Sequence, residues 1–217
     1  MYKIVFIASI FLIFSCTESQ KRKVKVTEYE TLSDNKFLEN AVNLTWIKDI
    51  KPSEALERFG RKKPFAKRTL KEIESIVIQT NAEDILAGEI SDDWVLIVEE
   101  NSFLEKKNLL DLSKDTEVIN VFWNVNGLAE VSIAKNGELI AQIRDIVTFT
   151  AGGSDTSLST FKEVEGKNPK LFLNLFNTLK TVKNYNWKSP VFEWIADYVN
   201  TDLPKDWLLK PHESAID

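Results

Sequence analysis

The sequence predicts an α+β domain in which a mostly antiparallel sheet of about five or six strands packs with helices and leads into a helical C-terminal part. Two observations predict this fold class. Strand-like apolar runs follow one another closely, and two of the gaps between them are Asn-Gly pairs, which favour hairpin turns. Segments with apolar residues at helical spacing separate the other runs and fill the chain after residue 168. We expect a single domain over residues 36–217.

The first half of the domain is expected to alternate short strands with short helices. Proline in a first turn and capping-box spacing mark the starts of the helices. Strands are predicted at residues 44–50, 85–90 and 94–99. Helices are predicted at residues 52–60, 69–80 and 102–112. The basic segment 61–68 is interpreted as a loop.

The clearest passage is a three-stranded meander over residues 117–144. Asn126-Gly127 and Asn136-Gly137 bracket eight residues, and strong β formers stand on both outer sides. Because Asn and Gly tolerate positive φ, each pair is expected to form a two-residue loop. That register places Glu130 opposite Trp123 on one face of the sheet. On the other face it gathers four polar side chains, Asn120, Asn124, Gln142 and Arg144.

The C-terminal part is predicted to be helical. One helix opens at Pro169 and another at Pro190, and both carry apolar residues on one stripe. The aromatic residues of this part recur at a helical spacing that is typical of residues buried in a core. Trp194 and Tyr198, one turn apart, are the pair expected to reach the surface. His212 lies close to the end of the chain and is interpreted as a residue of a frayed tail.

The N-terminus has the features of an export signal. Lys3 is followed by an uncharged apolar run over residues 4–14, which is shorter than the roughly 20 residues of a membrane-spanning helix. The sequence Ile13-Phe14-Ser15-Cys16 resembles the lipobox of bacterial lipoproteins. The resemblance implies a signal peptide at residues 1–15 and lipid on the sulfur of Cys16. A plain secretory peptide or an N-terminal membrane tail is the alternative, and residues 16–35 are interpreted as a flexible tether.

Composition excludes several classes of site from the domain. Cys16 is the one cysteine, so the domain has no thiol for a disulfide, a nucleophile or a thiolate metal site. A single histidine cannot build a multi-histidine metal site, and at the chain's end it does not suit a serine-histidine-acid triad. The 33 acidic residues outnumber the 28 basic ones, which argues against general nucleic-acid binding. We therefore predict no metal, no cofactor and no nucleic-acid partner.

Three sequence blocks resemble domain-of-unknown-function family 6461. Each block contains part of a predicted strand. The blocks are Leu44-Thr45-Trp46-Ile47-Lys48 with the segment through Gly60, Asp93-Trp94-Val95-Leu96-Ile97-Val98-Glu99, and Phe122 to Asn126 with the rest of the meander. Residues 192–200 and Leu203-Pro204 also fit in order and spacing, so the resemblance spans about residues 43–209. Glu99-Glu100-Asn101-Ser102 departs from the Glu-Pro-Asn-Gly that is typical of the family. The resemblance implies a related fold and no particular reaction.

We expect a membrane-tethered binding or interaction protein of the cell envelope, with the immunity proteins that neutralise toxins as one candidate class. Thr17 is not the aspartate that commonly retains lipoproteins in an inner membrane, so the outer membrane is favoured. The rival hypothesis is a hydrolase that uses carboxylates as its base. The preferred binding surface is the set Asn120, Asn124, Gln142 and Arg144. Second-choice site residues are Trp123, Glu130, Glu99, Glu100, Trp194 and Tyr198.

Overall fold

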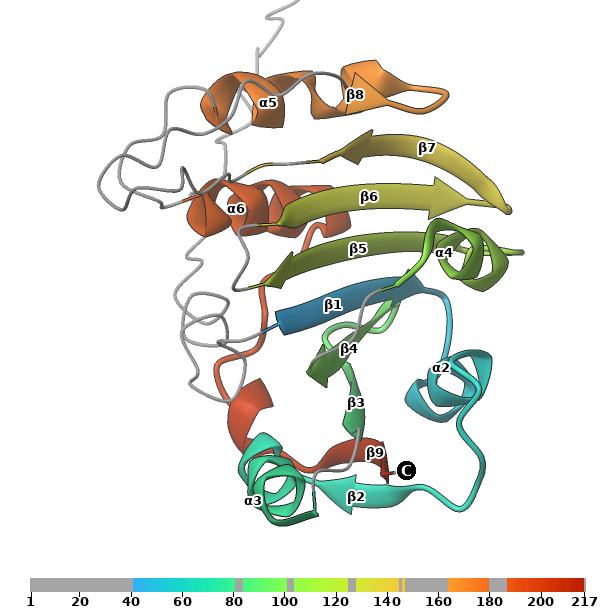
Figure 1. Ribbon diagram of the computed structural model, residues 1–217, viewed down its shortest axis with the longest axis vertical. Helices are drawn as coiled ribbons and strands as arrows, with labels where there is room; N and C mark the ends of the chain where they lie inside the picture. The colour runs from blue at the N-terminus through green and yellow to red at the C-terminus, as the bar shows by residue number, and fades with distance from the viewer. Residues whose placement is uncertain are drawn as a thin grey trace, which may run out of the picture.

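The protein is built on one nine-stranded sheet in which every pairing is antiparallel (Figure 1). The computed structural model describes residues 41–80, 84–100, 104–124, 128–144, 146, 164–179 and 187–216. Along the sheet the strand order is β2-β9-β3-β4-β1-β5-β6-β7-β8. The strands are β1 (Ala41–Lys48), β2 (Ala66–Arg68), β3 (Asp84–Glu89), β4 (Trp94–Glu100), β5 (Glu117–Asn124), β6 (Ala129–Lys135), β7 (Glu138–Ile143), β8 (Val164–Glu165) and β9 (His212–Ile216).

Five α-helices and two 3-10 turns complete the described part of the chain. They are α2 (Pro52–Arg58), α3 (Leu70–Thr80), α4 (Lys106–Leu112), η2 (Pro169–Phe172), α5 (Leu173–Leu179), α6 (Lys188–Val199) and η3 (Trp207–Leu209). The predicted α+β class and the mostly antiparallel sheet are confirmed. The expected five or six strands are too few, because β2 lies in the segment interpreted as a loop, β9 lies in the segment interpreted as a tail, and no element is predicted where β8 lies.

The sheet has two faces, and each packs against a different set of helices. The face that we call the α6 face carries Leu44, Trp46 and Val121, and packs on residues of α3, α5, α6 and η3. The opposite face, which we call the α2 face, carries Ile47 and Val118 and packs on residues of α2 and α4. In Figure 1, α2 and α4 lie together at one end of the strands β1, β5 and β6. Apolar side chains that alternate along each strand therefore fill two separate cores.

The meander forms as predicted, but its first turn is one residue longer than an Asn-Gly loop. Phe122 pairs with Glu130 and Trp123 pairs with Ala129, while residues 125–127 lie outside the described part. A turn longer by one residue shifts the register by one and turns every side chain of β6 to the other face. The predicted pairing of Glu130 with Trp123 is therefore wrong, and Glu130 lies on the α2 face.

The second turn of the meander has the predicted two-residue form. Asn136 and Gly137 have φ values of 51° and 76°, and Lys135 pairs with Glu138 across them. A bulge between Ile133 and Ala134 then shifts the register by one residue. Together the two shifts keep Ala141, Gln142 and Ile143 on their predicted faces relative to β5, although two residues further along it, whereas β6 is turned over.

Candidate functional site

A group of polar side chains crosses five adjacent strands on the α2 face, beyond the region that α2 and α4 cover. We call this group the polar row. Six of its eight members are buried, and only Glu130 and Arg144 reach solvent. Its members are Glu99 on β4, Asn43 and Thr45 on β1, Asn120 on β5, Glu130 and Ser132 on β6, Gln142 on β7, and Arg144 directly after β7.

One half of the polar row is a chain of hydrogen bonds that ends on the carboxylate of Glu99. The Nδ2 of Asn43 donates to Oε2 of Glu99 over 2.6 Å. The Oδ1 of Asn43 accepts from Nδ2 of Asn120, also over 2.6 Å, and this Nδ2 lies 3.0 Å from the hydroxyl oxygen of Thr45. Short bonds of this kind in a buried site polarise one another and fix the side-chain orientations.

The other half of the polar row centres on the carboxylate of Glu130. Its Oε1 accepts from Nε2 of Gln142 at 3.0 Å and from the hydroxyl of Ser132 at 3.3 Å. Its Oε2 lies 3.7 Å from Nε of Arg144. Within the described part of the chain, Oε1 of Gln142 is a buried acceptor that has no hydrogen-bond partner. A donor from water or from a ligand would complete this half of the row.

The structure brings together most of the preferred surface predicted from the sequence. Asn120, Gln142 and Arg144 all belong to the polar row. Asn124 lies at the end of β5 on the same face, where its Oδ1 accepts from the backbone N–H of Leu128 at 3.1 Å. The four residues therefore share one face, as predicted, and the turned-over strand β6 adds Glu130 and Ser132 to them.

The second-choice residues divide among four regions. Glu99 and Glu130 join the polar row. Trp123 lies on the α6 face in the core, where its ring meets that of Trp187 edge-on at 6.0 Å. The backbone of Glu100 pairs with Val42 at the end of β4, and the side chain of Glu100 lies outside the described part.

Trp194 and Tyr198 lie on α6, on the opposite side of the sheet from the polar row. Their rings stack with centroids 5.0 Å apart, and both side chains are half-buried rather than fully exposed. They line a groove between α5 and α6. They therefore form a surface of their own and add nothing to the polar row.

Sequence reasoning missed Asn43 and Thr45, which supply the centre of the hydrogen-bond chain. The available signal is the alternation of polar and apolar residues from Val42 to Trp46, which is typical of a strand with two different faces. The strand is predicted from residue 44 onward on its apolar content, so Asn43 falls outside it and Thr45 is counted as part of an apolar run.

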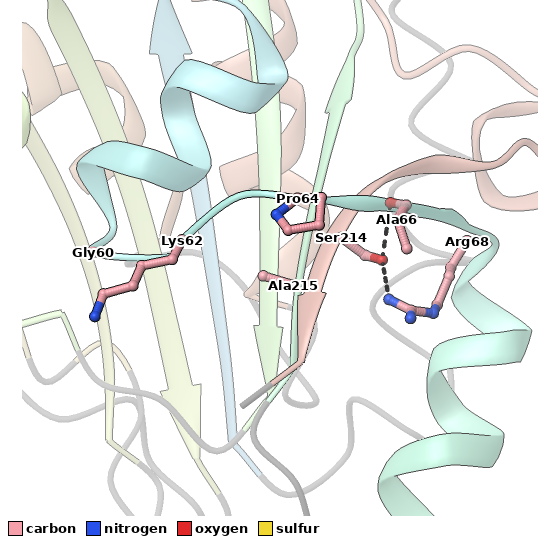
Figure 2. Close-up of a pocket in the computed structure, with 7 residues that line it drawn as sticks. All are labelled: Gly60, Lys62, Pro64, Ala66, Arg68, Ser214 and Ala215. Atoms are coloured by element: carbon pink, nitrogen blue, oxygen red, sulfur yellow. Dashed lines mark hydrogen bonds between the residues drawn. The ribbon is translucent and has the colours of Figure 1, made fainter.

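A second hollow lies where the segment after α2 meets the sheet edge (Figure 2). It encloses about 520 Å³ beside β2 and β9. The Nη1 of Arg68 donates to the hydroxyl of Ser214 at 2.8 Å, and that hydroxyl donates to the carbonyl of Ala66 at 3.2 Å. Figure 2 shows the side chain of Lys62 directed away from this group. The guanidinium of Arg68 thus ties β2 to β9, and the hollow has no convergent set of charges.

His212 is not a frayed tail residue, and that interpretation is wrong. It begins β9, is buried, and stacks on the indole of Trp207 with ring centroids 4.2 Å apart. Its Nε2 lies 2.6 Å from the carbonyl oxygen of Trp207. Burial lowers the pKa of His212, and the ring packs against Gly88, where an added Cβ would lie 2.2 Å from Nδ1. These contacts give His212 a structural role, because they hold β9 in its place in the sheet.

Two further features are absent from the described residues. Among them, no three side chains of the types His, Cys, Asp or Glu come close enough together to hold a metal ion. No helix among them has the length and the apolar character needed to cross a membrane.

The fold and the polar row define an α+β protein with a polar-lined sheet face. Residues 23–166 match the sequence profile of a family of unknown function (DUF6461), and since the match covers more than half of the chain, the chain belongs to this family. The match begins inside the predicted tether and ends before α5, so the resemblance expected for residues 192–209 lies outside it. No curated protein and no solved structure matches the chain.

Proposed function

We propose that the chain is a lipid-anchored protein of the bacterial cell envelope whose domain binds a protein partner through the polar row. The observation that supports this is the burial of six polar side chains on a sheet face whose other half is filled by residues such as Ile47, Val95 and Val118. Buried hydrogen-bonded groups add little net stability compared with apolar packing. A polar network that folding alone does not require therefore favours recognition.

The exposed end of the polar row indicates what the partner offers. Arg144 is exposed there, with its Nε near Glu130. The Oε1 of Gln142 is buried, so a partner does not reach it directly. We propose that a partner places an acceptor group against Arg144. A toxin that an envelope immunity protein neutralises is one partner class for such a surface.

The alternative is a hydrolase that uses Glu99 and Glu130 as its acid and base. These residues stand on β4 and β6, which are three steps apart in the sheet, so about 14 Å separates the strands that carry them. Glu130 bonds to Gln142 on β7, which draws its carboxylate further from Glu99. Paired carboxylates of glycosidases stand roughly 5 to 10 Å apart. This spacing favours the binding function over the hydrolase.

The binding proposal is tested with the full-length protein solubilised from its membrane. Wild type is expected to retain a stoichiometric protein partner from an envelope extract, and Arg144→Ala and Asn124→Ala are expected to weaken retention about tenfold or more. Lys167→Ala, which removes an exposed ion pair with Glu138 elsewhere on the surface, is the matched control and should retain the partner. If the partner is a toxin, expression of wild type protects cells and expression of Arg144→Ala does not.

Two results would contradict the proposal. One is equal retention of the partner by wild type, Arg144→Ala and Asn124→Ala. The other is turnover of a wall or glycan substrate by the protein that stops in Glu99→Gln and Glu130→Gln, which would establish the hydrolase.

The anchor is tested separately by labelling cells with an alkyne fatty acid. Wild type is expected to take up the label and to fractionate with the outer membrane. Cys16→Ser is expected to lose both properties and to appear in a soluble fraction, because the apolar run over residues 4–14 is too short to hold a cleaved chain in a membrane. Unlabelled wild type that still sediments with membranes would show that the lipobox interpretation is wrong.

A further inference from the structure

A groove of about 480 Å³ runs between α5 and α6, on the opposite side of the sheet from the polar row. Leu171, Leu175 and Pro190 supply its apolar surface, and Trp194 and Tyr198 supply an aromatic wall. Glu193 and Asp197 also line it, and among the described residues no lysine, arginine or histidine does. The groove therefore combines apolar surface with two negative charges.

The aromatic wall is held in place before any ligand arrives. The hydroxyl of Tyr198 donates to the buried carboxylate of Glu117, whose other oxygen lies 3.0 Å from Nζ of Lys135. Burial and this carboxylate raise the pKa of the Tyr198 hydroxyl, so the tyrosine stays neutral and remains the donor. Trp194 stacks on Tyr198 and also meets the ring of Phe172 at 4.9 Å. A fixed wall of this kind lowers the entropic cost of binding.

The two carboxylates are placed where they do not help the helix. Glu193 and Asp197 are both exposed and lie four residues apart on α6, a spacing at which like charges repel. Asp197 also lies in the last turn of α6, where the helix dipole favours positive charge. Among the described residues, neither makes an ion pair, whereas the helical pair Glu54 and Arg58 does. The arrangement lowers the stability of α6 and leaves both carboxylates available as hydrogen-bond acceptors.

We infer that this groove binds a lysine or arginine side chain presented by a segment of a partner protein. The charge of the groove is the argument for the occupant, since a cation satisfies both open carboxylates and its aliphatic stem fits the apolar surface of Leu175 and Pro190. A neutral saccharide suits the groove less well, because it leaves both carboxylates without a positive charge beside them. This second surface goes beyond the proposed function, which rests on the opposite face.

The probe is a fluorescein-labelled hexapeptide with two arginines between leucines, titrated into the full-length protein and followed by anisotropy. The neutral isostere citrulline replaces both arginines in a second peptide. The arginine peptide is expected to bind about tenfold more tightly than the citrulline peptide, and the preference should shrink as salt is raised. Glu193→Gln with Asp197→Asn, two isosteric changes at exposed positions, is expected to abolish the preference.

Asp92→Asn with Asp93→Asn removes two exposed charges in the β3–β4 turn and is the matched control, which should bind the arginine peptide as wild type does. Arg144→Ala should also bind it normally, so a failure of the polar row and a failure of this groove are distinguishable. The inference is overturned if both peptides bind equally, if the Glu193 and Asp197 changes have no effect, or if chitotriose binds in the groove and the arginine peptide does not.

Discussion

The two faces of the sheet are both buried, yet their chemistry differs. Along β1, β5 and β6 the α6 face is apolar apart from Glu117 and Lys135 at one end, and it packs on Phe192 and Ile195. The α2 face is apolar near α2 and α4, and its remaining part carries the polar row, with Phe122 between Asn43 and Glu130. On the α6 face, the volume and shape of a side chain decide whether it fits. On the α2 face, the availability of hydrogen-bond partners decides whether a side chain is tolerated. The difference indicates that substitutions on the two faces should follow different rules.

The largest effect is expected on the α6 face, at Phe192. Its side chain is fully buried, and its ring meets that of Trp123 edge-on at 6.4 Å. Phe192→Ala should lower the free energy of unfolding by about 3 to 5 kcal/mol, because it removes apolar burial and leaves a cavity. Urea denaturation of the full-length protein measures this.

Leu173→Ala on α5 is the control for that experiment, because Leu173 is 53% exposed and should cost less than about 0.5 kcal/mol. A loss below about 1 kcal/mol for Phe192→Ala would mean that α6 does not stabilise this face, and the contrast between the faces would disappear.

A smaller effect with a different signature is expected on the α2 face, at Asn43. Asn43→Ala removes the donor to Glu99 and the acceptor for Asn120, so it should lower the free energy of unfolding by about 1 to 3 kcal/mol. Converting Asn43, Glu99 and Asn120 to leucine removes both partners of these two hydrogen bonds, and the hydroxyl of Thr45 is the side-chain group that loses a donor. That triple variant should cost less than the single alanine change, since replacing a whole buried network by apolar groups can be nearly neutral.

The measurement is again urea denaturation, with the single and triple variants compared. A triple variant that is less stable than Asn43→Ala would show that the network holds this half of the face together. The polar row would then be scaffold, and the argument that it exists for binding would lose its support.

Local signals predicted the elements of both faces well. The Asn-Gly pair at residues 136–137 set the second turn of the meander, and the spacing of Phe192, Ile195 and Val199 gave the buried side of α6. These signals succeed because turn chemistry and helical periodicity act within a few residues. They also placed Asn120 and Gln142 on one face.

Long-range pairing is the part that local signals could not predict. The strand β9 inserts between β2 and β3, and Ser214 pairs with Ala66 and Leu86, which are far away in the chain. A short polar segment such as residues 212–216 has no periodicity that would distinguish it from a tail. The prediction of the first turn of the meander was wrong for a related reason. Adding one residue to a loop changes no local pattern and yet moves Glu130 to the other face.

The smallest of the three effects concerns an exception to the apolar character of the α6 face. Asp84 begins β3 and, by strand alternation, shares this face with Leu86. Its Oδ1 accepts from the backbone N–H of Ile85 at 2.6 Å, and within the described part its Oδ2 has no hydrogen-bond partner. Burial raises the pKa of Asp84 to about 6, although Arg68 and Arg61 lower it in part.

Because the pKa of Asp84 is higher in the folded chain than its ordinary value of 3.8, the folded state holds the proton more tightly than the unfolded state. The stability therefore falls as the pH rises from about 4 to about 6, and above that range the ionised carboxylate costs a constant amount. Asp84→Asn keeps an oxygen for Ile85 and removes the charge. It should raise the free energy of unfolding by about 1 to 2 kcal/mol at pH 7.5 and bring no gain at pH 4. Urea denaturation at both pH values measures this, and Asp92→Asn, a change at an exposed residue, is the control. An equal effect of Asp84→Asn at pH 4 and at pH 7.5 would show that Asp84 is not a buried charge on the apolar face.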